Sequence, residues 1–230
     1  DDLVTGVQTC ALPIYQVVAF YLYKKKKFDD QEAQKWWVCE SLKQFKKKLI
    51  NYNINLEVGS TAPAALQSAV LSEGADVGIA FDGDGDRVQC VAEDGSLVDG
   101  DELLFVIAND RLRNGGSLEG VVGTQMSNLG MEQALAGKGV DLERAQVGDR
   151  YVLERMKEKG WSLGGEASGH IICADLTTTG DGIVAALQVM AAIARSGETL
   201  VALKSAVHKL PQTLINVAVP DGFVLEQSES

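Results

Sequence analysis

The chain reads Phe-Asp-Gly-Asp-Gly-Asp-Arg over residues 81–87, directly after the apolar run Val77–Ala80. This run predicts a short buried strand, and an α/β protein places its chemistry in the loops at the carboxyl ends of such strands. The glycines between the acids let the backbone turn tightly, so the carboxylates of Asp82, Asp84 and Asp86 can converge. Adjacent carboxylates repel one another unless a cation lies between them, and oxygen ligands suit a hard ion, Mg²⁺ before Ca²⁺ or Mn²⁺. We therefore predict a divalent-metal loop, with an acidic, solvated turn as the alternative.

Two other kinds of site share part of this pattern. In an EF-hand, the three acids would take positions 1, 3 and 5 and Glu93 position 12, but Arg87 stands at position 6, where that loop needs glycine. The flanking residues also resemble strands rather than helices. A phosphatase of the haloacid dehalogenase type would use Asp82 as its nucleophile and Asp84 as its acid, but Asp86 replaces the usual following threonine. Each alternative therefore fits the loop only in part.

The composition is that of a folded chain with an acidic charge balance. Its 230 residues suffice for one large or two modest domains, and 46% of them are hydrophobic. The net charge of −11 argues against nonspecific binding to nucleic acid or to an anionic membrane. No apolar run reaches the ~18 residues of a membrane span. The four cysteines form no Cys-x-x-Cys pair and suggest neither a zinc site nor a disulfide framework, so we expect a reducing cytoplasm.

The first fifty residues differ in character from the rest. Residues 4–14 resemble the in-frame translation of a common sequencing-adapter oligonucleotide, so we expect residues 1–50 to be non-native, with a native terminus as the alternative. Residues 17–23 can form a strand and residues 29–48 a helix. We assign no function to the lysine run at residues 24–27.

From residue 51 the hydrophobic pattern becomes that of an α/β protein, and residues 51–116 are predicted to form a first, incomplete metal-binding domain. Asp99, with Glu102 three residues on, is a capping-box sequence for a helix that runs to about Arg113. Gly74 marks the end of an earlier helix. The predicted strands are residues 54–58, 77–81, 88–92 and 97–98, the last two forming a hairpin around Asp94-Gly95, and the predicted helices are residues 60–74 and 99–113.

Residues 117–219 are predicted to form a second, sugar-binding α/β domain, followed by a tail at residues 220–230. Asn114-Gly115-Gly116-Ser117 is typical of a junction between the two. Asp181 is expected to cap an apolar helix rather than to bind a ligand. The predicted strands are residues 121–124, 142–147, 171–174 and 213–219, and the predicted helices are residues 128–137, 151–159, 183–194 and 199–207. The fold class is therefore α/β, with two consecutive mixed-sheet α/β domains.

Five separated motifs resemble, in order and spacing, those of the α-D-phosphohexomutases. They are DGDGDR at residues 82–87, GTQMSN at 123–128, VGDRYV at 147–152, GEASGH at 165–170 and TTTGDGIVAALQV at 177–189. The last motif, with the MSN element, looks most like the phosphoglucosamine mutases within that family. The resemblance covers about residues 51–219, and it implies the later part of the second and all of the third of the family's four domains.

The resemblance implies a role for each residue of the first motif. Asp82, Asp84 and Asp86 would be ligands of Mg²⁺, and Arg87 would be a catalytic residue beside the transferring phosphate. The chemistry agrees, because phosphoryl transfer develops charge on oxygens that a metal and an arginine can stabilise.

The resemblance also implies a substrate-binding loop at GEASGH. Glu166 and Ser168 would bind the sugar, and they lie two residues apart in a glycine-flanked loop suited to accept and donate hydrogen bonds. His170 is either a phosphate or sugar contact or a structural histidine at the start of an apolar strand. Asp149 and Arg150 are either an internal ion pair or a phosphate site at the start of a helix, with a role at the edge of the site preferred.

The implied reaction converts glucosamine 6-phosphate to glucosamine 1-phosphate through a phosphoserine enzyme and a bisphosphate intermediate. The alternatives are a phosphomannomutase or phosphoglucomutase fragment and a noncatalytic module that binds a metal or a sugar phosphate. No serine loop of the TxSHNP type precedes the metal loop and no RxSGTEP loop follows residue 219, so we expect this polypeptide alone to lack mutase activity. The expected partner is an amino-sugar or hexose phosphate, and the sequence does not specify an oligomeric state.

Overall fold

The computed structural model describes residues 21–23, 63–213 and 215. The adapter-like residues 4–14, the strand predicted at 54–58 and the tail at 220–230 lie outside the described residues. So do the helix predicted at residues 29–48 and nearly all of the strand predicted at 213–219. Within the described part, the α/β fold class is confirmed.

The first sheet is antiparallel throughout its described strands, in the order β1-β2-β3-β4. β2 and β3 pair over their full lengths, from Phe81 opposite Val88 to Val77 opposite Ala92, so residues 82–87 form the loop that joins them. The hairpin predicted between β3 and β4 is confirmed. The four strands are β1 (Tyr21–Tyr23), β2 (Val77–Phe81), β3 (Val88–Ala92) and β4 (Leu97–Val98).

The second sheet is mixed, in the order β6-β5-β7-β8. β5 pairs in parallel with both β6 and β7, whereas β8 runs antiparallel to β7. The hairpin of β7 and β8 carries the GEASGH motif at its tip. The four strands are β5 (Gly120–Thr124), β6 (Asp141–Ala145), β7 (Leu163–Gly165) and β8 (Ile171–Cys173).

The helix ends follow the local sequence signals. The capping box at Asp99 is confirmed, because its carboxylate accepts the N–H of Glu102 and the Glu102 carboxylate accepts the N–H of Asp99. Asp181 caps the next apolar helix by accepting the N–H of Val184, as predicted. Glycines in the left-handed region end three helices. The described helices are α2 (Ala64–Glu73), α3 (Gly100–Arg113), α4 (Leu129–Ala136), α5 (Asp149–Lys159), α6 (Gly182–Ser196) and α7 (Leu200–Lys204).

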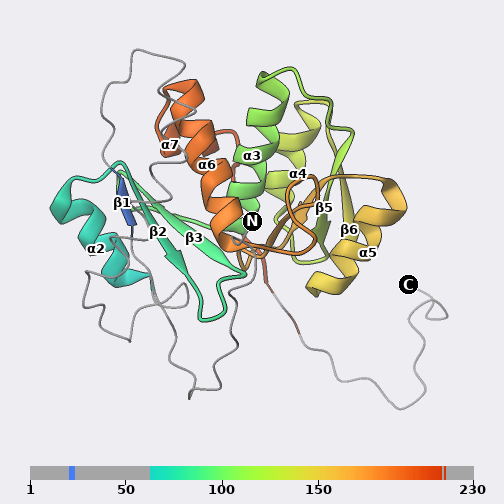
Figure 1. The fold of residues 1–230 in the computed structure, drawn as a ribbon, viewed down its shortest axis with the longest axis horizontal. Helices are drawn as coiled ribbons and strands as arrows, with labels where there is room; N and C mark the ends of the chain where they lie inside the picture. Colours follow the sequence, from blue (N-terminus) through green and yellow to red (C-terminus); the bar gives the residue numbers. More distant parts are fainter. Residues whose placement is uncertain (1–20, 24–62, 214, 216–230) are drawn as a thin grey trace, which may run out of the picture.

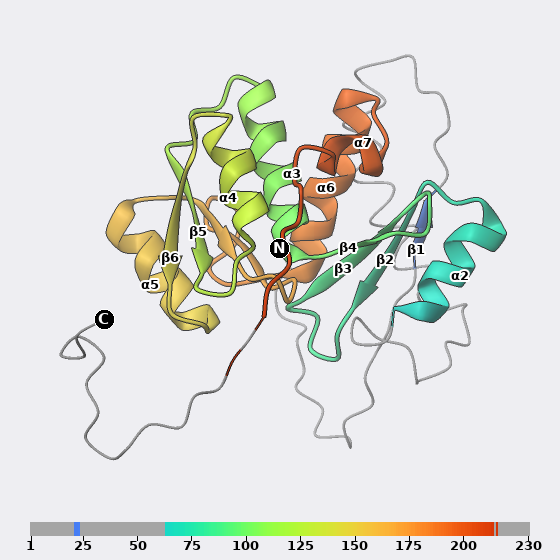
Figure 2. The same ribbon diagram turned by 180° about the vertical axis from the view of Figure 1, so that it is seen from behind.

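The described elements form alternating layers of helix and sheet (Figure 1, Figure 2). α2 covers the outer face of the first sheet, where Leu66 packs near Ala80. α5 covers the outer face of the second sheet, where Met156 packs near Ile172. α3 and α6 lie between the two sheets and join them in one continuous apolar core. Among the described helices, none combines the length and apolar character needed to cross a bilayer.

The central helix α3 is buried from Gly100 to Asp110, including the three acids in that span. Glu102 is 3% exposed and pairs with Lys204 and Lys209, whose ammonium groups lie 2.8 Å from its two carboxylate oxygens. Asp110, at the other end of the helix, pairs with Arg195 of α6. Because an unpaired charge would be costly at these depths, the pairs fix how α3 sits against α6, α7 and the segment that follows them.

The two sheets also meet directly, through glycines that are distant from one another in the sequence. Gly169 accepts the N–H of Val88 at 3.1 Å, and the N–H of Gly182 donates to the carbonyl of Gly85 at 2.9 Å. A Cβ on Gly169 would lie 2.0 Å from the carbonyl oxygen of Val88, and one on Gly100 would lie 2.0 Å from that of Glu166. We call Gly100, Gly169 and Gly182 the glycine seam. It lets the backbone at residues 85–88 touch the backbone of the GEASGH loop.

We expect Gly182→Ala to destabilise the protein by about 1–3 kcal/mol through overpacking. A Cβ at this position would lie 2.7 Å from the carbonyl oxygen of Arg87 and 2.9 Å from that of Gly85, so the metal loop and the start of α6 would have to separate. Urea unfolding followed by tryptophan fluorescence measures the change.

Gly137→Ala is the matched control, since its Cβ would find ordinary contacts at 3.5 Å and its φ is −61°. Equal unfolding free energies for the two variants would contradict this account of the seam.

Asp101 of α3 is a third buried acid, and it is 1% exposed. Its Oδ2 accepts the N–H of Asn128 at 2.7 Å, which ties α3 to the start of α4. Burial raises the pKa of Asp101 to about 6, and the nearby carboxylate of Asp99 also raises it. The folded protein therefore holds this proton more tightly than the unfolded chain does.

The raised pKa of Asp101 predicts how stability depends on pH. Its contribution to the unfolding free energy is fully present below the unfolded pKa of 3.8 and is lost as the pH rises to about 6. Asp101→Asn removes this loss while keeping an acceptor for the Asn128 N–H. We expect the variant to gain on the order of 1–3 kcal/mol relative to the parent between pH 4 and pH 6. Parallel stability curves from urea unfolding across this range would show that Asp101 is not responsible.

Candidate functional site

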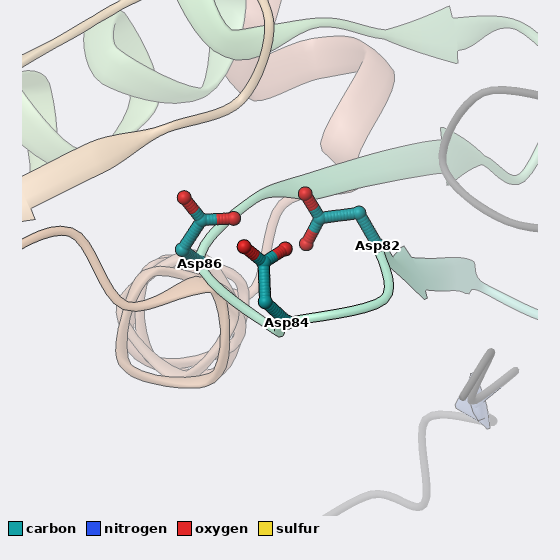
Figure 3. Close-up of side chains that lie close together, drawn as sticks. All are labelled: Asp82, Asp84 and Asp86. Carbon is teal, nitrogen blue, oxygen red and sulfur yellow. The ribbon is translucent and has the colours of Figure 1, made fainter. Parts of the chain in front are cut away.

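The three acids of the β2–β3 loop converge, as the sequence predicts. One carboxylate oxygen from each of Asp82, Asp84 and Asp86 lies within 4.8 Å of the other two, and Figure 3 shows the side chains pointing toward one another across the loop. Gly85 has a φ of 76°, which supports the tight turn. Strands flank the loop on both sides, so the paired helices of an EF-hand are absent around these residues.

The electrostatics of this loop suit a cation. Burial, together with the neighbouring carboxylates of Asp82 and Asp84, raises the pKa of Asp86 to about 6. Oδ1 of Asp86 is buried and has no hydrogen-bond partner within the described part of the chain. Three clustered carboxylates with an unpartnered buried oxygen fit a hard divalent ion, which would relieve both the repulsion and the missing contact.

Arg87 stands directly at the edge of the acidic cluster. Its backbone N–H donates to Oδ1 of Asp82 at 3.1 Å, which closes the loop, and its Nε lies 3.8 Å from Oδ2 of the same residue. The guanidinium side chain is 49% exposed. It is therefore free to reach an anion bound in front of the loop while it remains next to the acids.

The GEASGH loop forms a tight turn at the tip of the β7–β8 hairpin. The N–H of Gly169 donates to the carbonyl of Glu166, and the N–H of Glu166 donates to the carbonyl of His170, both at 3.0 Å. Glu166 is half-buried, and its Oε1 accepts the N–H of Gly148 at 2.9 Å. Ser168 is exposed at the tip. One carboxylate and one hydroxyl thus lie on a hydrogen-bonded turn.

His170 lies next to the metal loop and is 3% exposed. Its Nε2 lies 3.7 Å from Oδ2 of Asp86 and 4.0 Å from Oδ2 of Asp149. Gly180 fits against the ring, where a Cβ would lie 2.2 Å from the ring atoms. A buried position is what we expect of a structural histidine. A direct contact between His170 and a substrate stays a prediction.

The VGDRYV motif, which the structure describes in full, contains no side-chain ion pair between Asp149 and Arg150, and its preferred role at the edge of the site stays a prediction. The ion pair of Arg150 is with Glu154, one turn along α5, and its side chain is 80% exposed. Asp149 lies beside His170 at the edge of the acidic cluster. The contribution of Gly148 could not be predicted, because a glycine before a helix gives no local sign that its N–H reaches Glu166.

The GTQMSN motif supports the scaffold at the end of β5. Asn128 caps α4 by accepting the N–H of Gly130, and it also accepts the N–H of Leu210. The Arg144 guanidinium donates to the carbonyls of Thr124 and Ser127. These contacts fix the loop between β5 and α4. The other four motifs meet at one place, where the metal loop, the GEASGH loop and the starts of α5 and α6 come together.

Known proteins are similar to this chain over most of its length. Residues 99–212 match the family model described as phosphoglucomutase/phosphomannomutase, alpha/beta/alpha domain III. A phosphoglucosamine mutase of Teredinibacter turnerae is 58% identical over 177 residues, which are 77% of this chain and 40% of that protein. A phosphoglucosamine mutase of Aeromonas hydrophila is 59% identical over 170 residues, which are 74% of this chain and 38% of that protein. The chain thus spans about two fifths of the length of these curated relatives.

Solved structures show the same fold at lower identity. A phosphoglucomutase/phosphomannomutase family protein from Burkholderia thailandensis has a TM-score of 0.59 at 24% identity, over 67% of this chain and 35% of that chain. An N-acetylglucosamine-phosphate mutase of the α-D-phosphohexomutase superfamily has a TM-score of 0.54 at 18% identity, over 68% of this chain and 44% of that chain. The solved structures share the fold, and the curated relatives together with the family model show that this chain belongs to the phosphoglucosamine mutases of the α-D-phosphohexomutase family.

Proposed function

We propose that the chain supplies the metal loop and the sugar-binding loop of a phosphoglucosamine mutase. The reaction would interconvert glucosamine 6-phosphate and glucosamine 1-phosphate. The observation that carries the proposal is the direct backbone junction between the loop of Asp82, Asp84 and Asp86 and the loop of Glu166 and Ser168. Identities of 58% and 59% to two phosphoglucosamine mutases support this substrate over mannose or glucose phosphates.

The proposed chemistry divides between the two loops. Asp82, Asp84 and Asp86 would hold Mg²⁺, which supplies positive charge to the phosphoryl oxygens when it is bound. The exposed guanidinium of Arg87 would bind the same phosphoryl group and stabilise its negative charge. Glu166 would accept a hydrogen bond from a sugar hydroxyl, and Ser168 would donate or accept another. The two loops together would orient the sugar relative to the phosphate.

Two further proposals accompany this function. Mg²⁺ is proposed as the ion because the cluster offers only carboxylate oxygens, the ligands that hard cations prefer. A reducing cytoplasm is proposed as the compartment because Cys90 and Cys173, one in each sheet, are buried free thiols.

We expect Asp84→Asn to weaken Mg²⁺ binding by about tenfold or more, because it removes one of three converging charges. Asp84 is the exposed member of the three, so the fold should tolerate the change. Isothermal titration calorimetry of the purified chain with Mg²⁺ measures the affinity.

Asp141→Asn is the control, since it makes the same change of charge at an exposed position at the start of β6. An equal loss of affinity in both variants would indicate a general charge effect and would contradict a site in the β2–β3 loop.

We expect the chain to bind glucosamine 6-phosphate more tightly than mannose 6-phosphate, and Glu166→Gln to weaken that binding by about tenfold, the usual scale for a hydrogen bond to a charged group. Chemical-shift changes on addition of each sugar phosphate to the ¹⁵N-labelled chain give the affinities. Glu119→Gln changes another acid by the same substitution and should bind as the parent does. Binding that is unaffected by Glu166→Gln would contradict the proposed sugar loop.

A further inference from the structure

Gly148 has a backbone conformation that few other residues adopt. It lies between β6 and α5 with a φ of 130° and a ψ of 136°. The backbone N–H of Gly148 has a specific partner, because it donates to Oε1 of Glu166 at 2.9 Å. The two residues are eighteen positions apart, so this hydrogen bond joins two motifs that are separate in the sequence.

The rest of Glu166 is fixed independently of that hydrogen bond. Its carbonyl accepts the N–H of Gly169 and its N–H donates to the carbonyl of His170. The backbone of Gly100 packs directly against the Glu166 carbonyl. With the backbone held in this way, the N–H of Gly148 determines where the carboxylate points. The start of α5 adds a favourable field, because helix N-termini attract negative charge.

The carboxylate keeps one oxygen available. Oε1 is engaged by Gly148, whereas among the described residues no hydrogen bond reaches Oε2. A half-buried carboxylate with one oxygen fixed and one open is well arranged to accept a hydrogen bond from a ligand hydroxyl. A fixed acceptor also loses less conformational freedom on binding than a mobile one.

We propose that Gly148 is a positioning residue for sugar binding: its N–H holds Glu166 so that the second carboxylate oxygen faces the sugar hydroxyls. This inference rests on the proposed sugar-binding role of Glu166. Gly148 itself does not touch the substrate, and it acts through Glu166.

The requirement for glycine follows from the backbone. A φ of 130° is disfavoured for any residue with a Cβ, and a Cβ on Gly148 would lie 3.3 Å from Cδ2 of Tyr151. A larger residue would relax toward negative φ, and the N–H would then turn away from Glu166. The expected consequence is a mobile carboxylate on an otherwise intact turn.

The test compares Gly148→Ala with Gly160→Ala in the full chain. Gly160 ends the same helix with a φ of 70°, and a Cβ there would have no atom within 4 Å, so the control introduces backbone strain without a contact to Glu166. For each variant we would measure the affinity for glucosamine 6-phosphate, the affinity for Mg²⁺ and the midpoint of thermal unfolding.

Gly148→Ala should weaken sugar-phosphate binding by about tenfold while Gly160→Ala leaves it unchanged. Both variants should keep the Mg²⁺ affinity of the parent. A loss of sugar affinity equal in the two variants, or absent from Gly148→Ala, would overturn the proposal.

A ligand-free measurement separates this inference from the proposed function. Amide hydrogen exchange at Gly148 should become faster in Glu166→Ala, which removes the acceptor, and should stay near that of the parent in Glu166→Gln, which keeps one. Unchanged exchange in Glu166→Ala would overturn the positioning role. If the parent chain binds no sugar phosphate but Gly148 exchange responds as expected, the proposed substrate is wrong and the positioning of Glu166 stands.

Discussion

The backbone of one loop can touch the backbone of another only where no side chain stands between them, and this constraint organises the molecule. At Gly169 the contact leaves no room for a Cβ, and the N–H of Val88 reaches a carbonyl on the opposite loop. Gly182 makes the equivalent contact from the first turn of α6. Because backbone contacts are short and directional, they hold the metal loop against the GEASGH turn more closely than packed side chains could. These backbone contacts therefore set the distance between the metal loop and the GEASGH turn.

The central helix explains how such a junction is supported. α3 contributes apolar residues such as Phe105 to the core that contains both sheets, and its acids pair outward with α6, α7 and the segment beyond them. The pairs of Glu102 and Asp110 lie near opposite ends of the helix, so they resist both sliding and rotation. Buried pairs of this kind are weak evidence for stability, but they specify one arrangement of the helices.

The sequence predicts the local features of the fold and fewer of the long-range ones. The capping box at Asp99 and the β2–β3 acidic loop depend on residues within a few positions of each other, and the structure confirms their geometry. The hydrogen bond from Gly148 to Glu166 and the position of His170 behind Asp86 depend on tertiary packing. No periodicity or spacing encodes such contacts. The resemblance of whole motifs could place these residues near one site, but it could not predict which atoms form hydrogen bonds or ion pairs with each other.

The shared core has a consequence for attempts to divide the protein. The matched domain model begins at residue 99, immediately before α3, yet residues of β2 and β3 such as Ile79 and Val88 belong to the same apolar cluster as Leu104 and Ile107. A cut between β4 and α3 would leave both pieces with a bare hydrophobic face, and each would tend to aggregate. Dissection would also separate Gly169 and Gly182 from the backbone at residues 85–88 that they contact. Because the two loops share this apolar cluster, we expect the metal loop and the sugar loop to unfold together in a single transition.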